Sequence, residues 1–285
     1  MKIAPFFALL CLGLPMACAI EEGDVPLEAH SSTLGNGSKI HDISGPADWE
    51  QLKNQNSVKC KAIGDKDIYV SGVTVEAIDR YDETNGGAVG NYYLQDTTDS
   101  PKPYQGMTMF GASFSPPNLR VSEGDVVDIL GVLSEFPGPP PPTDPFPYCR
   151  TLPEISGSVS FRFEGKTPPA IKVTLDQLKT YKTARPYIGM LVRVESIAIA
   201  DIGCATDDVD PQSKRCKPGI RFGAPLIVGQ GIAKSNVPTL TNELFELQTK
   251  GPDLKDGTQI KSVTGILTYF YGFHIAPRSA EDIEI

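Results

Sequence analysis

Side chains that could carry catalysis are sparse in this chain. The three histidines are His30, His41 and His274, and the sequence contains no nucleophile elbow, His-Glu-x-x-His motif, P-loop or dinucleotide-binding glycine pattern. Only His274 falls in a strand-like segment, between Phe273 and an apolar continuation. A general base there would need a Ser or Cys within hydrogen-bond reach, which the spacing does not supply. We therefore expect no enzymatic activity, no cofactor and a packing role for His274.

The cysteines indicate disulfide chemistry. Beyond Cys11 and Cys18 near the N-terminus, an even set remains: Cys60, Cys149, Cys204 and Cys216. In an oxidising compartment this set predicts two disulfides. Of the three possible pairings we favour Cys60 with Cys149 and Cys204 with Cys216, because each pair then stays within one of the two repeats described below. A zinc site is the alternative, but the spacing has no Cys-x-x-Cys pair and no nearby histidine.

Carboxylates gather in two places where a cation could bind. The first set is Asp79, Asp82, Glu83, Asp96 and Asp99, and the second is Asp207, Asp208 and Asp210. Calcium prefers such oxygen ligands, but neither set has the regular spacing of a calcium loop. We therefore expect solvated turn carboxylates and predict no metal.

The first 19 residues are typical of a signal peptide. A basic residue, Lys2, precedes an apolar run that ends at Leu14, and small residues follow at Ala17 and Ala19. The run is shorter than the roughly 20 apolar residues of a membrane span. Two processing routes remain open: cleavage after Ala19, or acylation of Cys18 at a lipobox-like stretch in which Pro15 is atypical. Both predict an extracytoplasmic protein that is secreted, periplasmic or lipid-anchored in the outer membrane.

The net charge of -9 lowers the odds of a general nucleic-acid binder. Such proteins need a basic face that replaces the counterions on phosphate.

The elements that must position these residues occur twice. Two sets of segments correspond: 49–53, 70–79 and 124–133 in the first copy, and 175–179, 192–201 and 257–267 in the second. Each copy is large enough for its own core, since domains of roughly 100 to 130 residues fold alone. We predict a signal peptide at 1–19, a flexible leader at 20–43, a first domain at 44–168 and a second at 169–285.

Each copy predicts a short helix followed by five strands. Trp49 and Leu52 share one helical face in the first copy, and in the second Thr174 and Gln177 form a capping box around Leu175 and Leu178. Alternating apolar residues and Gly or Pro breaks predict these strands: 67–78, 90–96, 106–110, 126–136 and 158–163, then 190–200, 220–229, 245–250, 260–271 and 273–276.

The tracts 90–96 and 271–278, with the matching Gly-Val-Leu and Gly-Ile-Leu strands, resemble tandem OB-folds of bacterial extracytoplasmic proteins. The resemblance covers roughly residues 45 to 285. It implies a mainly β fold of two tandem five-stranded OB-like barrels, each preceded by a short helix. It also implies binding or assembly before catalysis.

An OB barrel binds ligands across its second and third strands and the loops beside them. Here that surface would include Tyr81, Tyr93 and Gln95 with the loop 82–87. Alternation places Tyr92 and Leu94 in the core and Tyr93 and Gln95 on the opposite face. The structural alternative is that Tyr93 is an exposed or interface residue. The proline-rich stretch 137–147 predicts a stiff polyproline II segment.

The sequence thus predicts a non-enzymatic, secreted or surface-anchored binding or assembly module with a protein or glycan ligand. Two alternatives remain. One is an accessory nucleic-acid-binding module of an extracellular nuclease system, and the other is a structural subunit of a surface assembly.

Overall fold

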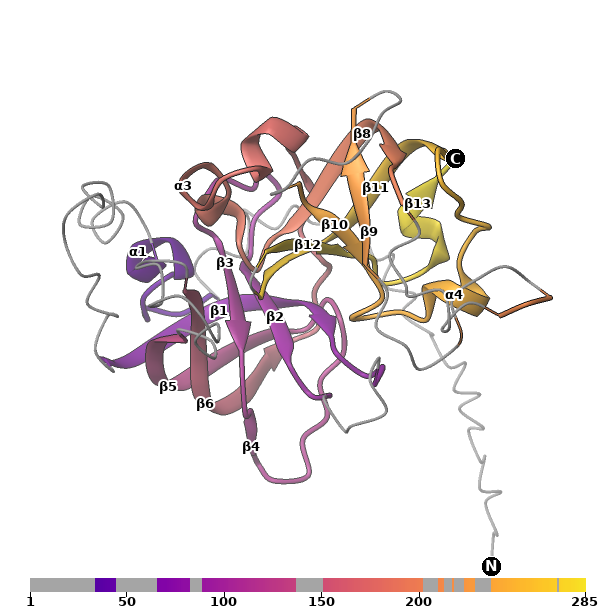
Figure 1. Ribbon diagram of the computed structural model, residues 1–285. Coiled ribbons are helices and arrows are strands. Elements are labelled where there is room, and N and C mark those ends of the chain that lie inside the picture. The colour runs from indigo at the N-terminus through magenta and orange to yellow at the C-terminus, as the bar shows by residue number, and fades with distance from the viewer. Residues whose placement is uncertain are drawn as a thin grey trace, which may run out of the picture.

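Strands dominate the computed structural model, which describes residues 34–44, 66–82, 89–136, 151–201, 210–212, 217, 223–228, 237–270 and 272–285. They form two sheets, one in each half of the chain, and the helices are short. Figure 1 shows the two halves side by side, the first in indigo to magenta and the second in salmon to yellow. We call them unit 1 and unit 2. No helix among the described residues is long and apolar enough to cross a membrane.

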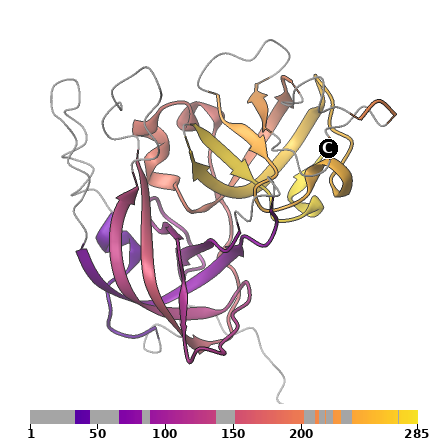
Figure 2. The same cartoon turned by 60° about the horizontal axis from the view of Figure 1, so that its bottom comes forward.

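Unit 1 is a closed five-stranded barrel, as predicted. Its strands are β1 (Lys66–Ile78), β2 (Tyr92–Asp96), β3 (Gly106–Met109), β5 (Val126–Phe136) and β6 (Leu152–Phe163), with β4 (Ser113–Ser115) added at the edge of β6. Neighbours pair antiparallel in the order β3-β2-β1-β5-β6, and a parallel β3–β6 pairing closes the ring. Figure 2 shows these strands wrapping around one another.

The segment before the first strand belongs to unit 1. Helix α1 (Ile40–Ser44) buries Ile40 and Ile43 in the barrel core beside Val70 and Met107. Ser38 also bonds to β1, since its backbone N–H donates to the carbonyl of Tyr69. The predicted flexible leader therefore extends too far, because residues 34–43 pack on the barrel. The apolar Ile-x-x-Ile step of α1 is the signal that the prediction overlooked.

Unit 2 contains a seven-stranded sheet. Its strands are β7 (Ile171–Lys172), β8 (Leu191–Ile199), β9 (Gly223–Ile227), β10 (Thr239–Thr241), β11 (Gln259–Tyr269), β12 (Phe273–Ala276) and β13 (Ile283–Glu284). Its helices are η2 (Leu175–Leu178), α3 (Tyr181–Ala184), η3 (Arg185–Tyr187), α4 (Leu247–Lys250) and η5 (Ala280–Asp282). Strand β11 pairs with both β8 and β12, and β10 pairs with both β9 and β12. The β8–β9 joint has two residue pairs, whereas the corresponding β1–β2 joint of unit 1 has five.

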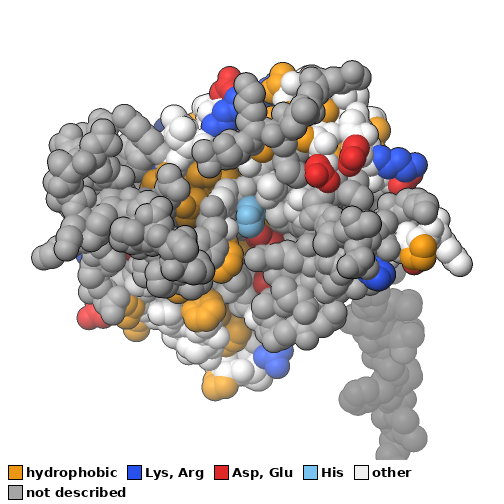
Figure 3. All heavy atoms as spheres, in the orientation of Figure 1, with side chains coloured by type: hydrophobic (Ala, Val, Ile, Leu, Met, Phe, Trp, Pro, Cys, Tyr) orange, Lys and Arg blue, Asp and Glu red, His pale blue; other side chains and the backbone are white. Residues whose placement is uncertain are grey.

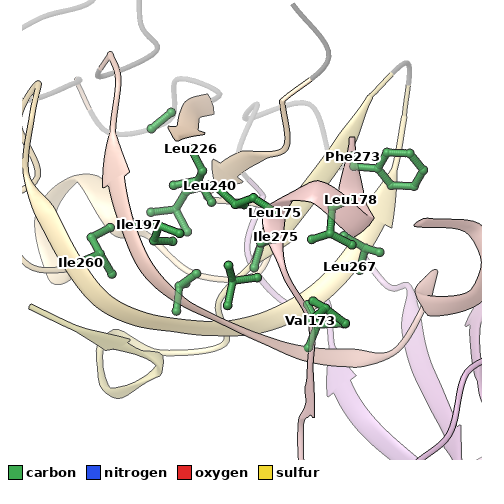
Figure 4. Packing of buried hydrophobic residues seen from close by; sticks show 14 of the residues in the cluster. Val173, Leu175, Leu178, Ile197, Leu226, Leu240, Ile260, Leu267, Phe273 and Ile275 are labelled. Carbon is green, nitrogen blue, oxygen red and sulfur yellow. The ribbon is translucent and has the colours of Figure 1, made fainter. Parts of the chain in front are cut away.

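The predicted capping box of unit 2 is confirmed. Thr174 accepts from the backbone N–H of Gln177, and the Gln177 side chain accepts from the backbone N–H of Thr174. The capped element is a 3-10 helix, and it buries Leu175 and Leu178 in the core of unit 2. Figure 4 shows both leucines close to Ile275 and Leu267 within that core.

Two strand predictions need correction. The stretch 245–250 alternates apolar and polar residues like a strand, but 247–250 is helix α4, whose turn is closed by the bonds from Lys250 N–H to the Glu246 carbonyl and from Gly251 N–H to the Leu247 carbonyl. The strand that follows β9 in the chain is instead β10, which is too short for alternation to reveal. Strand β6 also begins at Leu152 rather than Ser158, because it pairs along the whole of β5.

Several predictions lie outside the described residues. They concern the signal peptide with Cys18, the helix with Trp49 and Leu52, the proline-rich stretch 137–147, and the four cysteines at positions 60, 149, 204 and 216.

Candidate functional site

The predicted ligand face of unit 1 is covered by unit 2. Tyr93 is 5 % exposed and packs in a cluster with four residues of unit 2: Leu191, Leu244, Ile266 and Ala276. Gln95 is completely buried, and its Oε1 atom accepts from the backbone N–H of Leu191 at 3.2 Å. The predicted alternation is confirmed, since Leu94 lies in the barrel core and Tyr92 packs against it. The outer face is therefore a junction between units, which is the structural alternative for Tyr93.

Tyr81 is half-buried just after β1 and is not part of this cluster. The loop that was expected to complete the platform, apart from Asp82, lies outside the described residues. The structure thus does not bring Tyr81, Tyr93 and Gln95 together as one open surface.

Backbone contacts tighten the junction. A Cβ atom on Gly106 of β3 would lie 2.5 Å from the carbonyl carbon of Gly189, and one on Gly189 would lie 2.5 Å from the backbone nitrogen of Met107. Gly189 also has a φ of +76°, which favours glycine. Nearby, the backbone N–H of Tyr104 donates to the carbonyl of Pro186 at 2.6 Å. Glycines at both positions let these two backbone segments touch without side chains between them.

A buried ion pair crosses the same junction. Arg185 of η3 bonds both carboxylate oxygens of Glu135 from β5, and these side chains are 2 % and 4 % exposed. Thr151 donates to Glu135, and the Tyr181 hydroxyl donates to the Thr151 carbonyl at 2.8 Å. Burial alone lowers the pKa of Arg185, but Tyr181 and Glu135 outweigh it and the pKa is raised. Both side chains of the pair thus have hydrogen-bond partners, which buried ions require.

A second polar group lies on the outer face of unit 2. Thr239, His274 and Thr268 are direct cross-strand neighbours on β10, β12 and β11. The Nδ1 atom of His274 lies 2.5 Å from Oε1 of Glu243, and the Thr268 hydroxyl donates to Oε2 of Glu243 at 2.7 Å. The side chains of His274 and Glu243 are 15 % and 12 % exposed. We call Thr239, Glu243, Thr268 and His274 the His274 row.

The row holds its imidazole in one orientation. The bond between Nδ1 and Glu243 leaves the Nε2 atom as the second hydrogen-bonding atom of the ring. Thr268 is not placed as a nucleophile, because its proton is directed at Glu243 rather than its oxygen at the imidazole. Within the row, the bonds to Glu243 thus orient the imidazole, and they do not place the Thr268 oxygen against it. Sequence reasoning missed it, because Glu243 and His274 are 31 positions apart.

The predicted carboxylate sets do not assemble into a cation site among the described residues, where no group of three or more metal-ligating side chains occurs. Asp96 instead caps α1, as its two oxygens accept from the backbone N–H groups of Ile40 at 2.8 Å and His41 at 3.0 Å. Burial raises the pKa of Asp96 to about 6, against the opposing effect of these two bonds. Asp210 accepts from the backbone N–H of Gln212, as a turn carboxylate does.

Comparisons with known proteins found no match. No protein-family model, no curated protein and no solved structure matches the chain.

Proposed function

We propose that this protein is a non-enzymatic, extracytoplasmic binding module made of two OB-like barrels that act as one body. The proposal depends on the observation that unit 2 covers the outer face of unit 1. OB barrels use this face for ligands, and here Tyr93 and Gln95 bind unit 2 with it. We therefore assign ligand binding to unit 2, where the His274 row lies on the outer face.

The pairing pattern of unit 2 supports a second OB-like barrel. Its strands β8, β9, β10, β11 and β12 pair as β1, β2, β3, β5 and β6 do in unit 1. The parallel β10–β12 joint corresponds to the parallel β3–β6 joint. The internal repeat of the sequence has the same order, so one duplicated barrel accounts for both patterns.

Of a protein or a glycan ligand, the His274 row favours a glycan. The Nε2 atom of His274 and the half-buried hydroxyl of Thr239 lie in the same row, and both groups can form hydrogen bonds with sugar hydroxyls. Such groups already held in place lose little entropy when a polyol binds. Figure 3 shows Lys and Arg side chains scattered over one face of the molecule among the coloured residues, which gives a nucleic-acid backbone no basic stripe there.

A glycan array probed with the mature protein tests this function. We expect selective binding of at least one oligosaccharide, and loss of the signal in His274→Gln. His41→Gln is the matched control, because His41 is an exposed histidine of unit 1. Single-stranded DNA at low salt serves as the competing probe. DNA binding together with no signal on the glycan array would overturn the glycan proposal.

Export and disulfides belong to the same proposal and have their own test. The leader and the even cysteine set support an oxidising compartment. Peptide mapping of the nonreduced protein should find Cys60 linked to Cys149 and Cys204 linked to Cys216, with a mature N-terminus at Ile20 or at an acylated Cys18. Free thiols at these four positions would contradict the pairing.

A further inference from the structure

The carboxyl group of Glu76 is buried beside the junction. Glu76 lies in β1 at the irregularity where the pairing with β2 jumps from Val75 to Ala77. It is 0 % exposed, and neither carboxylate oxygen has a hydrogen-bond partner among the described residues. The next residue, Ala77, belongs to the junction cluster with Tyr93 and Ala276. An ionised carboxylate is strongly disfavoured in such surroundings.

The charge of a cation in unit 2, Arg278, acts on Glu76, and this cation is already paired with Asp282. Arg278 follows Ala276 of the junction cluster by two residues, and its Nε and Nη2 atoms each bond an oxygen of Asp282 at 3.1 Å. Arg278 acts on Glu76 from across the junction and favours the ionised form, whereas the exposed Glu123 of unit 1 opposes it. Asp282 pairs with Arg278 and so weakens the effect of the Arg278 charge on Glu76. Burial outweighs these charges and raises the pKa of Glu76 to about 8.

We propose that Glu76 is a protonated carboxyl group when the two units are docked, and that its deprotonation loosens the junction. Separation of the units would expose Glu76 to water, where it ionises at an ordinary carboxyl pKa. The docked state therefore holds one more proton than the open state between roughly pH 4.5 and 8. Docking is strongest at the acidic end of this window and weakens as the pH rises through it.

Amide hydrogen exchange on the full-length mature protein reports docking directly. The backbone N–H groups of Leu191 and Tyr104 both donate across the junction, so their protection measures it. After correction for intrinsic exchange, we expect protection of both amides to fall at least tenfold from pH 6.5 to pH 9. Glu76→Gln is neutral at every pH and should abolish this fall. Glu123→Gln is the control, because this carboxylate acts on the same arginine yet lies exposed, and it should keep the wild-type fall.

A second measurement does not depend on any variant folding. The side-chain carboxyl carbon of Glu76 in the wild type, followed by NMR through a pH titration, should have a midpoint above pH 7. A midpoint near 4.5, or an equal fall of protection in wild type and Glu76→Gln, would overturn the proposal. Neither result bears on whether the His274 row binds a glycan.

Discussion

Gln95 and Leu191 belong to different units, and the side-chain oxygen of the first accepts a hydrogen bond from the backbone N–H of the second at 3.2 Å. Gln95 is completely buried, so this bond forms away from water. A buried backbone N–H that lost its acceptor would carry the full cost of desolvation. The bond therefore fixes the position of β8 over β2, and it makes the outer face of the first barrel a structural surface.

Truncation of Tyr93 should weaken the junction rather than a ligand site. Tyr93→Ala removes the ring that packs against Leu191 and Ile266, and large aromatic truncations in cores cost about 3 kcal/mol or more. We expect the free energy of unfolding in urea to fall by that amount. Phe110→Ala is the control, because the exposed Phe110 should change stability by less than about 0.5 kcal/mol. Equal effects of the two variants would argue against a packed junction.

Loss of one partner of the Glu135–Arg185 pair should be costly. Glu135→Ala leaves a buried guanidinium without its carboxylate, for which about 3 to 5 kcal/mol is typical. The double variant Glu135→Leu with Arg185→Met should recover much of this loss, since no charge then remains buried. In the exposed Lys179–Asp176 pair, Asp176→Ala should cost less than about 1 kcal/mol. Denaturant unfolding of the four proteins measures these differences, and a mild Glu135→Ala effect would contradict the buried pair.

The cap of α1 should hold the N-terminal segment on the barrel. Asp96→Asn replaces one of two acceptors by an amide that faces a backbone N–H, and lost caps cost about 1 to 2 kcal/mol. Hydrogen exchange in residues 34–44 should accelerate while the strands of unit 2 keep their protection. Asp42→Asn is the control, since Asp42 is an exposed residue that accepts from the Lys39 backbone N–H. Equal acceleration by both variants would show that Asp96 has no special role.

Stability should decrease as the pH rises from acidic to mildly basic. The pKa of Glu76 is raised by burial to about 8 and that of Asp96 to about 6, so the folded chain binds more protons than the unfolded chain above the ordinary carboxyl range. The sign follows from linkage: stability is lost between roughly pH 4 and 6 through Asp96 and between roughly pH 4.5 and 8 through Glu76. Glu76→Gln should flatten urea midpoints measured from pH 6.5 to 9. A wild-type profile that is already flat there would contradict the buried, protonated carboxyl.

The sequence correctly predicted which residues of β2 face the barrel core and which face outward. It did not predict that unit 2 covers the outward face. Alternation in β2 correctly separated Leu94 from Tyr93, because a strand has two faces with a period of two. Whether a second unit lies on the outer face depends on contacts such as Gly106 with Gly189, 83 positions apart by their residue numbers. A local signal was Glu76, a charged residue in the buried part of β1, where apolar residues are usual.

The most direct test of the proposed function is a calorimetric titration of the strongest array oligosaccharide into wild type, His274→Gln and His41→Gln. The account predicts that His274→Gln weakens binding at least tenfold, because its side chain cannot reproduce an imidazole held by Glu243, and that His41→Gln binds as wild type does. The absence of any bound oligosaccharide, or equal affinity in all three proteins, would contradict it.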